Sequence, residues 1–414
     1  MGKTSKAWLL GLDLQIWILA AGRLLSHIGT GFILFYAPIF FVNTVGLTST
    51  QVGIAIGSAS ISGVLGRFLG GSWADNPAWG RKKTLLIALA ISAIADVALA
   101  STNTFSMLIA GNLLQGLGVG LYWPATETIV ADLATKEKRN EAFAIARLAD
   151  NVGMGVGVIL GGVIISTINN YRLLFVLDGI SFVAFFGLVF LAIKESQNYQ
   201  HVDGQDKAPI LESWSKALGD RRLVVFLAVN IIFTMYISQI QSTAPLYLTN
   251  FVEAQPELIT LLFTWHVIFA SVCQLPVARL LNRFSRPKAL MISLLLWGCG
   301  FTMMWGVGMS ALPMLIGAIA TLGIMSFAMI SYTPSASSLV VDLAPESQRG
   351  VYMALNSQCW AIGYLIGPPL GGWALDQIPA IAHGFWLAAA VSIVPCLGVL
   401  IVLEQLLAKP KLKT

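Results

Sequence analysis

Seven ionisable residues interrupt the long apolar runs of this sequence, and chemistry is most to be expected at these positions. They are Arg23, Arg67, Asp96, Glu127, Arg147, Asp150 and Asp178. A charge among apolar side chains is costly, so such residues pair, carry protons or ions, or recognise a charged ligand. All seven lie in the first half of the chain, whereas the apolar runs of the second half contain no Asp, Glu, Lys or Arg. Charge-dependent chemistry is therefore expected in the first half.

Glu127, Arg147 and Asp150 are the candidates for moving a proton. Arg147 and Asp150 are three residues apart and share one face of a helix, and Glu127 lies about 60° from Asn112 around its own helix. We expect a Glu127–Arg147 pair, with Asp150 as the deeper and less compensated acid. Three interpretations remain open: Glu127 or Asp150 carries a transferable proton, the charges form a static pair, or they bind a substrate directly.

The elements that carry these residues are predicted to be membrane-spanning helices. The chain is 56% hydrophobic and 11% charged, with a mean hydropathy of +0.77, whereas about a quarter of the residues of soluble globular proteins are charged. Twelve apolar runs recur along it, each about 20 residues long and able to cross a bilayer core as a helix. Open strands are excluded, because backbone hydrogen bonds in lipid have to be satisfied within the element. The sequence predicts an all-α polytopic membrane protein with twelve transmembrane helices, the first retained rather than cleaved as a signal peptide.

The Lys and Arg residues predict the orientation of these helices. With the N-terminus inside, 21 of the 25 fall on cytoplasmic segments, and only Arg172 falls on an outer loop. This is the bias of the positive-inside rule. We therefore expect an inner-membrane protein of a bacterial cell with both termini in the cytoplasm. Contact with anionic lipid headgroups accounts for the net charge of +5, so no nucleic-acid partner is expected.

The chain repeats itself at a distance of 210 residues. Residues 122–162 and 332–372 align without gaps and are identical at 13 of 41 positions. The shared positions pair Tyr122 with Tyr332, Pro124 with Pro334, Asp132 with Asp342 and Arg139 with Arg349. The only long polar stretch separates the two copies. We expect a six-helix bundle over residues 1–193, a cytoplasmic linker over 194–222 with a short amphipathic helix near its end, and a second six-helix bundle over 223–414.

Two patterns carry a resemblance to a known family. Gly71-Ser-Trp-Ala-Asp75 with Gly80-Arg81-Lys82 is similar to the loop 2–3 signature Gly-x-x-x-Asp-(Arg)-x-Gly-Arg-Lys of the major facilitator superfamily. Glycines 363, 367 and 371, spaced four apart, resemble the glycine-rich span-5 pattern of its efflux branch, here in span 11. Glycines 153, 157 and 161 of the first copy have the same spacing, and each set forms one smooth face that lets helices approach closely. The alternative is a role in sealing the cavity. The first copy has Val158 where that pattern has proline, and Asn112 stands where proton-driven drug antiporters usually have arginine. The resemblance covers essentially the whole chain and implies two bundles that rock about a site near the midplane.

The resemblance also implies an inner gate at the cytoplasmic ends of the helices. Arg81 would meet Asp132 and Asp75 would meet the start of span 11, in pairs that break as the halves rock. The alternative is a solvated salt bridge worth about 0–1 kcal/mol. The implied gate residues are Gly71, Asp75, Gly80, Arg81, Asp132, Arg139, Arg286, Asp342 and Arg349.

Polar and aromatic residues on the helices that line the cavity in this family are candidates for substrate contact. They are Arg23, His27, Tyr36, Asn112, Gln115, Tyr122, Trp123, Tyr236, Gln239, His266, Asn356 and Trp360. The alternative for each aromatic residue is ordinary helix packing, and for His266 a satisfied packing role. Asp96 and Asp178 lie toward the outer ends of peripheral helices, and we expect structural roles for them.

Together these features favour a secondary transporter working by alternating access, in which a small amphipathic or drug-like molecule leaves in exchange for protons. The alternatives are uptake or facilitated diffusion of a sugar, organic anion or amino acid, and a non-transporting receptor of the same fold. An enzyme is not expected, because the chain has no HExxH, Cys/His cluster or Gly-x-Ser-x-Gly, and the phosphate loop of an ATP-driven pump is also missing. The four cysteines show no metal-ligand spacing, so we expect neither metal nor cofactor; a monomer is the working expectation.

Overall fold

The computed structural model describes residues 12–74, 76, 79–135, 138–195, 210–345 and 348–408. The chain divides into two compact units, residues 1–201 and 202–414. The division falls within the polar stretch that the sequence predicts as a linker. Whether 194–222 forms a separate linker stays a prediction, since residues 196–209 lie outside the described part of the chain.

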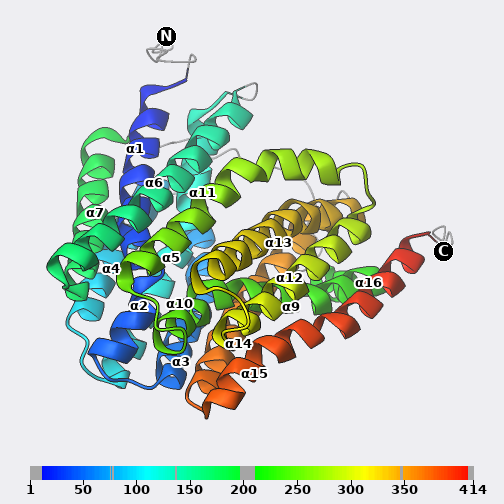
Figure 1. The fold of residues 1–414 in the computed structure, drawn as a ribbon. Coiled ribbons are helices and arrows are strands. Elements are labelled where there is room, and N and C mark those ends of the chain that lie inside the picture. Colours follow the sequence, from blue (N-terminus) through cyan, green and yellow to red (C-terminus); the bar gives the residue numbers. More distant parts are fainter. Residues whose placement is uncertain are drawn as a thin grey trace, which may run out of the picture. The chain divides into compact units, whose positions relative to one another are not determined.

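Long helices form the first unit. Its described helices are α1 (Leu14–Ile33), α2 (Tyr36–Ile39), the π-helical turn η2 (Phe40–Thr44), α3 (Ser49–Ala74), α4 (Arg81–Ala100), α5 (Phe105–Leu133), α6 (Arg139–Ile168) and α7 (Tyr171–Ala192). Helix α1 packs against α6 and α7, α3 packs against α5, and α4 packs against α5 and α7 (Figure 1). The helices that carry the buried charges are therefore neighbours.

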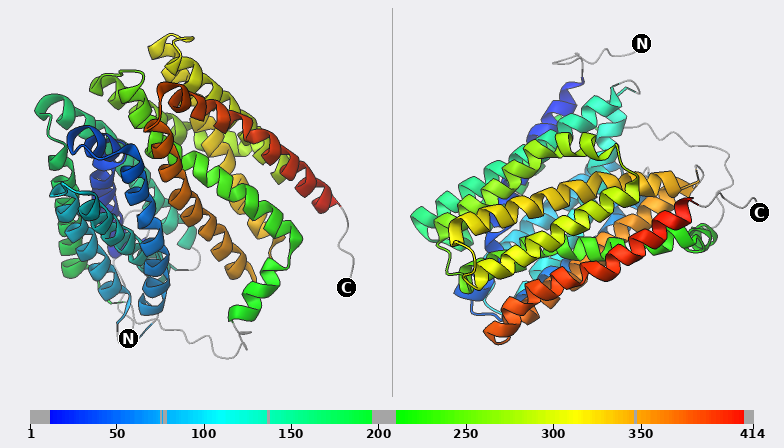
Figure 2. Two further views of the ribbon diagram at one scale, coloured as in Figure 1. Left: turned by 90° about the horizontal axis from the view of Figure 1, so that it is seen from below. Right: turned by 45° about the vertical axis from the view of Figure 1, so that its right-hand side comes forward.

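The second unit repeats this plan. Its described helices are α8 (Ile210–Leu218), α9 (Arg221–Gln241), α10 (Thr243–Asn250), α11 (Pro256–Leu281), α12 (Arg286–Gly308), α13 (Met314–Leu343), α14 (Arg349–Leu375), α15 (Pro379–Val391) and α16 (Ile393–Ala408). The short α8 covers the predicted amphipathic stretch. Helix α9 packs against α14, as α1 packs against α6, and α12 runs beside α13 (Figure 2).

Three of the spans are broken, each four or five residues before a proline. The breaks follow Ile33, Gln241 and Val391, at the ends of α1, α9 and α15. The carbonyls of Leu34, Gln241 and Val391 lie four residues before Pro38, Pro245 and Pro395. Proline lacks the N–H that would bond such a carbonyl, and its ring clashes with it. The first span of each unit is thus broken at a corresponding place.

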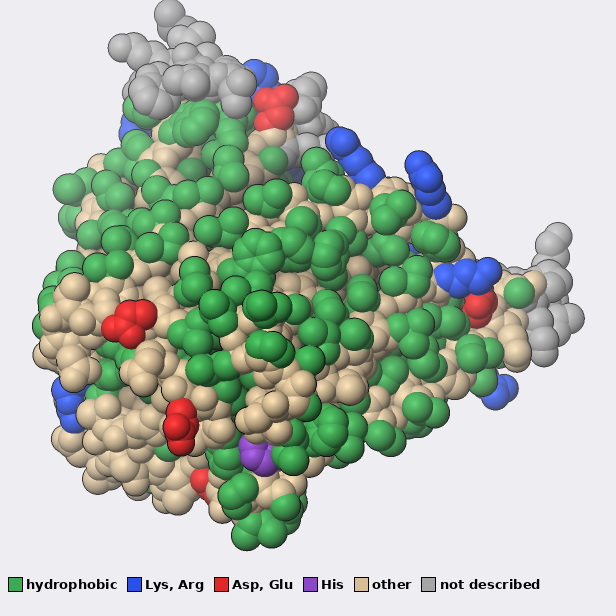
Figure 3. Space-filling model, viewed as in Figure 1, with side chains coloured by type: hydrophobic (Ala, Val, Ile, Leu, Met, Phe, Trp, Pro, Cys, Tyr) green, Lys and Arg blue, Asp and Glu red, His purple; other side chains and the backbone are tan. Residues whose placement is uncertain are grey.

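The helices are long and apolar enough to cross a bilayer. Eleven segments among the described residues meet this standard by length and composition. Helix α14 is also long, with 27 residues, but its glycines, prolines and amides dilute its hydropathy; it is the twelfth span. Hydrophobic side chains cover much of the face drawn in Figure 3, with few charged side chains among them. The prediction of an all-α membrane fold is confirmed.

Glycines spaced four apart bring one helix pair in each unit into close contact, as predicted. A Cβ on Gly157 of α6 would overlap the Ile28 carbonyl oxygen of α1 and lie 2.8 Å from Gly31 Cα. In the second unit, a Cβ on Gly367 of α14 would overlap Ser238 Oγ of α9. Both glycine faces are packing faces between neighbouring helices, which is how small residues act in membrane proteins. A role in sealing a cavity stays a prediction.

Candidate functional site

A buried ion pair joins α1 to α6. Arg23 Nε donates to Asp150 Oδ1 at 2.9 Å and Arg23 Nη2 donates to Asp150 Oδ2 at 2.5 Å. The side chains are only 1% and 8% exposed. Such a bidentate pair is the geometry in which a guanidinium best satisfies a carboxylate. The expectation that Asp150 is the less compensated acid was therefore wrong: its partner lies 127 residues away, on a helix that spacing along α6 could not identify.

His27 and two aromatic residues surround this pair. His27 Nδ1 lies 3.4 Å from Asp150 Oδ1 and 2.9 Å from the Arg23 carbonyl oxygen, one turn earlier on α1. The Arg23 guanidinium carbon lies 5.4 Å from the ring centre of Trp123 and 6.0 Å from that of Tyr122, both on α5. The geometry is that of cation–π contacts. Four of the predicted site residues are thus brought together around Asp150.

A second ion pair lies at the surface of the same unit. Arg147 Nη2 donates to Glu127 Oε1 at 2.6 Å, which confirms the predicted pair. In contrast to the buried pair, the two side chains are 55% and 43% exposed. The Arg147 guanidinium carbon is 5.0 Å from the ring centre of Trp123. Trp123 therefore contacts two guanidinium groups, one from each ion pair.

These contacts give the cluster two chemical capacities. Arg23 and Arg147 each pair with one acid, so that a proton added to either acid leaves its arginine without that counter-charge. Losing the bidentate contact at Asp150 would cost more than losing the single, water-accessible hydrogen bond at Glu127. The Trp123 ring also offers an aromatic face on which a flat or cationic ligand would compete with the guanidinium groups.

The predicted gate contains an ion pair in each unit. In the first unit, Arg81 at the start of α4 pairs with Asp132 at the end of α5. In the second, Arg286 at the start of α12 lies 3.6 Å from Asp342 at the end of α13. The first pair is nearly buried and the second is largely exposed. The sequence repeat is therefore a repeat of contacts; that these pairs act as a gate stays a prediction.

Sequence reasoning missed the glutamate that closes this end of the first unit. Glu195 Oε1, just beyond α7, accepts hydrogen bonds from the backbone N–H groups of Arg81 at 2.7 Å and Lys82 at 3.1 Å. The carboxylate accepts from N–H groups at the start of α4 that have no partner within the helix. Its negative charge also interacts favourably with the positive end of the helix dipole. Gly80 has φ +77°, and a Cβ there would lie 2.6–2.8 Å from the carboxyl group. The signature glycine is thus explained by backbone conformation and by space.

Replacing Glu195 with alanine is expected to lower the free energy of unfolding in mixed micelles by about 0.5–2 kcal/mol, the range for losing a helix cap. Glu404 offers a matched control, since it lies near the end of the last span of the second unit but contacts side chains: it accepts from Ser285 Oγ at 3.1 Å and lies 3.6 Å from Lys288 Nζ. Glu404→Ala should cost less than about 1 kcal/mol. Equal losses in the two variants would contradict the capping role.

The other predicted gate residues form no ion pair between helices in the described part of the structure. Arg139 Nη2 donates to the Ala131 carbonyl oxygen at 3.2 Å, and a Cβ on Gly71 would meet no atom within 4 Å. Asp75 and the side chain of Arg349 lie outside the described part of the structure. The contacts predicted for these two residues stay predictions.

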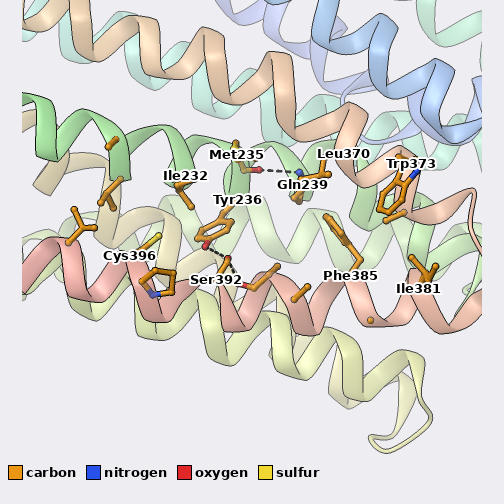
Figure 4. A pocket seen from close by; sticks show the side chains of 18 of the residues that line it. Ile232, Met235, Tyr236, Gln239, Leu370, Trp373, Ile381, Phe385, Ser392 and Cys396 are labelled. Carbon is orange, nitrogen blue, oxygen red and sulfur yellow. Dashed lines mark hydrogen bonds between the residues drawn. The ribbon is translucent and has the colours of Figure 1, made fainter.

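The second unit contains an apolar pocket of about 840 Å³ between α9, α14 and the last span (Figure 4). Tyr236 and Gln239, both predicted as substrate contacts, line it. Tyr236 Oη lies 2.6 Å from Ser392 Oγ, and Gln239 Nε2 donates to the Met235 carbonyl oxygen at 3.3 Å. Tyr236 and Gln239 thus already have polar partners among the residues that line the pocket.

The remaining candidates of the second unit lie in hydrogen-bonded or stacked contacts. His266 Nδ1 lies 2.6 Å from Ser326 Oγ and the residue is 4% exposed, which fits the packing alternative. Asn356 Oδ1 accepts from Asn230 Nδ2 at 2.9 Å, and Trp360 stacks on Tyr364 with ring centres 6.1 Å apart. A role of these residues in substrate contact stays a prediction.

Three candidates of the first unit lie away from the Asp150 cluster. Tyr36 is buried, with Oη 3.5 Å from the Val158 carbonyl oxygen. Asn112 Nδ2 donates to the Leu108 carbonyl oxygen at 2.9 Å, within its own helix. Gln115 Oε1 is buried without a hydrogen-bond partner. Gln115 is thus the one of the three with a buried side-chain polar atom that lacks a hydrogen-bond partner.

Comparison with known proteins gives a consistent result. The sequence profile of the Major Facilitator Superfamily matches residues 19–253 and 240–413. Multidrug resistance protein MdtH of Escherichia coli O9:H4 (strain HS) is 27% identical over 342 residues, which are 81% of this chain and 80% of MdtH. MdtH of Citrobacter koseri is 27% identical over 346 residues, with 82% and 81% covered.

Solved structures share the fold. A mutant of the nucleoside transporter NupG has a TM-score of 0.81 at 14% identity, with 94% of this chain and 99% of that chain covered. A bacterial homologue of the human lysosomal transporter Spinster has a TM-score of 0.76 at 15% identity, with 94% and 96% covered. At such low sequence identities, the similarity to these structures establishes only that the fold is shared. Because the family profile spans nearly the whole chain, this multi-pass membrane protein belongs to the major facilitator superfamily, a family of transporters.

Proposed function

We propose that this chain is a secondary active transporter that exports small amphipathic or drug-like molecules in exchange for protons. Its similarity to the MdtH proteins, named for multidrug resistance, supports the substrate class. We further propose that it lies in a bacterial inner membrane with both termini in the cytoplasm, as the distribution of Lys and Arg predicts. Alternating access of the two units would carry the substrate across.

The observation that carries the proposal is the position of Trp123 between the two ion pairs. The ring contacts both Arg23 and Arg147. An aromatic or cationic substrate that stacks on Trp123 would displace Arg147 from Glu127, because Arg147 is the more exposed of the two guanidinium groups. Substrate binding and the ionisation of Glu127 are thereby linked through one ring.

Glu127 is the better of the two candidate acids for an exchangeable proton. It is partly open to water and makes one hydrogen bond to Arg147, which is itself exposed. Asp150 is buried and held by two hydrogen bonds from Arg23. Protonation of Glu127 weakens one exposed hydrogen bond with Arg147, whereas protonation of Asp150 leaves the buried guanidinium of Arg23 without a counter-charge. In this proposal Asp150 fixes α1 against α6 and Glu127 exchanges the proton.

The same geometry weakens the alternative of an anionic metabolite. Recognition of such a ligand by Arg23 would require access to its buried guanidinium. Both carboxylate oxygens of Asp150 occupy that guanidinium. A ligand carboxylate would have to displace Asp150 and leave it buried without its partner, which is unfavourable by several kcal/mol.

The proposal is tested in reconstituted vesicles with a pH-sensitive dye inside. Adding aromatic organic cations is expected to change the internal pH of vesicles with wild-type protein. The Glu127→Gln variant is expected to lose this proton movement while still binding the compounds, since the neutral amide mimics the protonated acid. Glu141→Gln, at an exposed carboxylate in the first turn of α6, is the matched control and should behave as wild type.

Two results would count against the proposal. Full proton movement in Glu127→Gln would remove this acid from the coupling role. A response to sugars, organic anions or amino acids but to none of the cations would show that the substrate class is wrong. Absence of any flux across both panels would favour a non-transporting protein of the same fold.

A further inference from the structure

Two fully buried aspartates lie against each other's helices in the first unit, away from the Asp150 cluster. Asp96 of α4 and Asp178 of α7 are both 0% exposed. A Cβ on Gly179 would lie 3.4 Å from Asp96 Cβ, so Asp96 packs against the turn of α7 that carries Asp178. A Cβ on Gly29 of α1 would overlap Asp178 Oδ1, so α1 also packs against the Asp178 carboxyl group.

The carboxyl oxygens are poorly satisfied. Both oxygens of Asp96 and Oδ2 of Asp178 are buried and have no hydrogen-bond partner. Asp178 Oδ1 is 3.4 Å from Ser181 Oγ, but that hydroxyl donates more closely to the Asp178 carbonyl oxygen, at 2.7 Å. An ionised carboxylate in such a place would lack the hydrogen bonds and counter-charge that make burial tolerable.

The charged groups of the surrounding helices are engaged elsewhere. On α1, Arg23 pairs with Asp150, and His27 contacts the Arg23 carbonyl oxygen. Arg67 of α3 interacts electrostatically with Glu127 of α5, which also pairs with Arg147. On α4, Arg81 pairs with Asp132, Lys82 Nζ donates to the Phe190 carbonyl oxygen, and Lys83 is exposed at the start of the helix, 13 residues before Asp96. Arg172 of α7 donates to Ala100, Thr102 and Asn103. No described cation is therefore left facing the two aspartates.

The outer side of α4 and α7 offers no counter-charge either. A groove of about 470 Å³ runs between the two helices, and apolar residues line it throughout. Ala93 and Gly179 belong to this lining, on the same turns as Asp96 and Asp178. In a bilayer such a groove is covered by lipid chains, so water does not reach the carboxyl groups from this side.

We propose that Asp96 and Asp178 bind protons and stand as neutral carboxylic acids in the folded protein at neutral pH. They form a protonation site separate from Glu127 and Asp150, and the proposal does not depend on the transported substrate or on coupling. Two ionised carboxylates on adjoining turns of α4 and α7 would repel each other in addition to their desolvation cost. Neutral carboxylic acids avoid both costs, and the proton of such an acid can donate a hydrogen bond to one of the oxygens that lack a partner.

Infrared spectroscopy of the purified, reconstituted protein tests the proposal, since a protonated carboxyl group has a carbonyl stretch well separated from that of a carboxylate. Wild-type protein at neutral pH should show this acid band. Asp96→Asn and Asp178→Asn should each remove part of it, and the double variant should remove it. Glu257→Gln, at an exposed glutamate of α11, is the control and should leave the band unchanged.

A stability measurement gives a second readout with a defined sign. The folded protein binds protons at these sites, whereas an unfolded aspartate is ionised above pH of about 4. Folding stability from these sites therefore falls as the pH rises. The double Asn variant should lose less stability than wild type between pH of about 6 and 9. An acid band unchanged by the substitutions would overturn the proposal, as would a sodium-dependent stability that disappears with them.

Discussion

Replacing Asp150 with asparagine is expected to lower the free energy of unfolding by about 3–5 kcal/mol, the range for removing one partner of a buried ion pair. The substitution leaves the guanidinium of Arg23, 1% exposed, without a counter-charge between α1 and α6. It also removes the acid next to His27. Reversible unfolding in mixed micelles, followed by helix content, measures the loss.

Two control variants separate the charge effect from a general effect of substitution. Glu127→Gln disrupts the exposed pair with Arg147, and should cost no more than about 1 kcal/mol. A double variant, Arg23→Met with Asp150→Leu, removes both charges and should recover most of the loss, because well-packed apolar residues can replace a buried ion pair. Equal losses for Asp150→Asn and Glu127→Gln would show that burial does not distinguish the two pairs.

Replacing Gly157 with alanine is expected to destabilise the first unit by about 1–3 kcal/mol, the range for overpacking a core. The added methyl group would overlap the Ile28 carbonyl oxygen and lie 2.8 Å from Gly31 Cα. Both are backbone atoms of α1, so no side chain can rotate away, and the two helices have to separate. Unfolding in mixed micelles measures this loss.

The same substitution elsewhere should have the opposite sign. A Cβ on Gly187 of α7 would meet no atom within 4 Å. Gly187→Ala therefore gains helix propensity without a clash, and should stabilise the protein by up to about 1 kcal/mol. If both alanine variants were neutral, close packing of α1 on α6 would not depend on Gly157.

Several features could be predicted because they depend on residue type and spacing along one helix. The Glu127–Arg147 pair followed from the depth of each residue relative to the Asp132 and Arg139 ends of their helices, since neighbouring antiparallel helices place equal depths side by side. The Gly157 face followed from the four-residue spacing of glycines, and the Arg81–Asp132 pair was implied by the family resemblance. The structure contains all three contacts.

Other features depended on contacts between helices far apart in the sequence. Asp150 was expected to lack a full counter-charge, because the expectation considered residues of α5 and α6 only. Its partner, Arg23, lies on α1. Glu195 carries no pattern that marks it as a partner for the start of α4. Asp96 and Asp178 were expected to be structural, and only their burial on adjoining turns of α4 and α7 makes them a candidate protonation site.

The sequence by itself determined that the chain spans a membrane as helices in two related halves, and that its buried charges lie in the first half. Composition and periodicity are sufficient for this, because a bilayer accepts only long apolar segments whose hydrogen bonds are internal. The tertiary structure decided which charges are compensated. Whether a buried acid is paired depends on the helix that packs against it, and spacing along the chain does not contain that information.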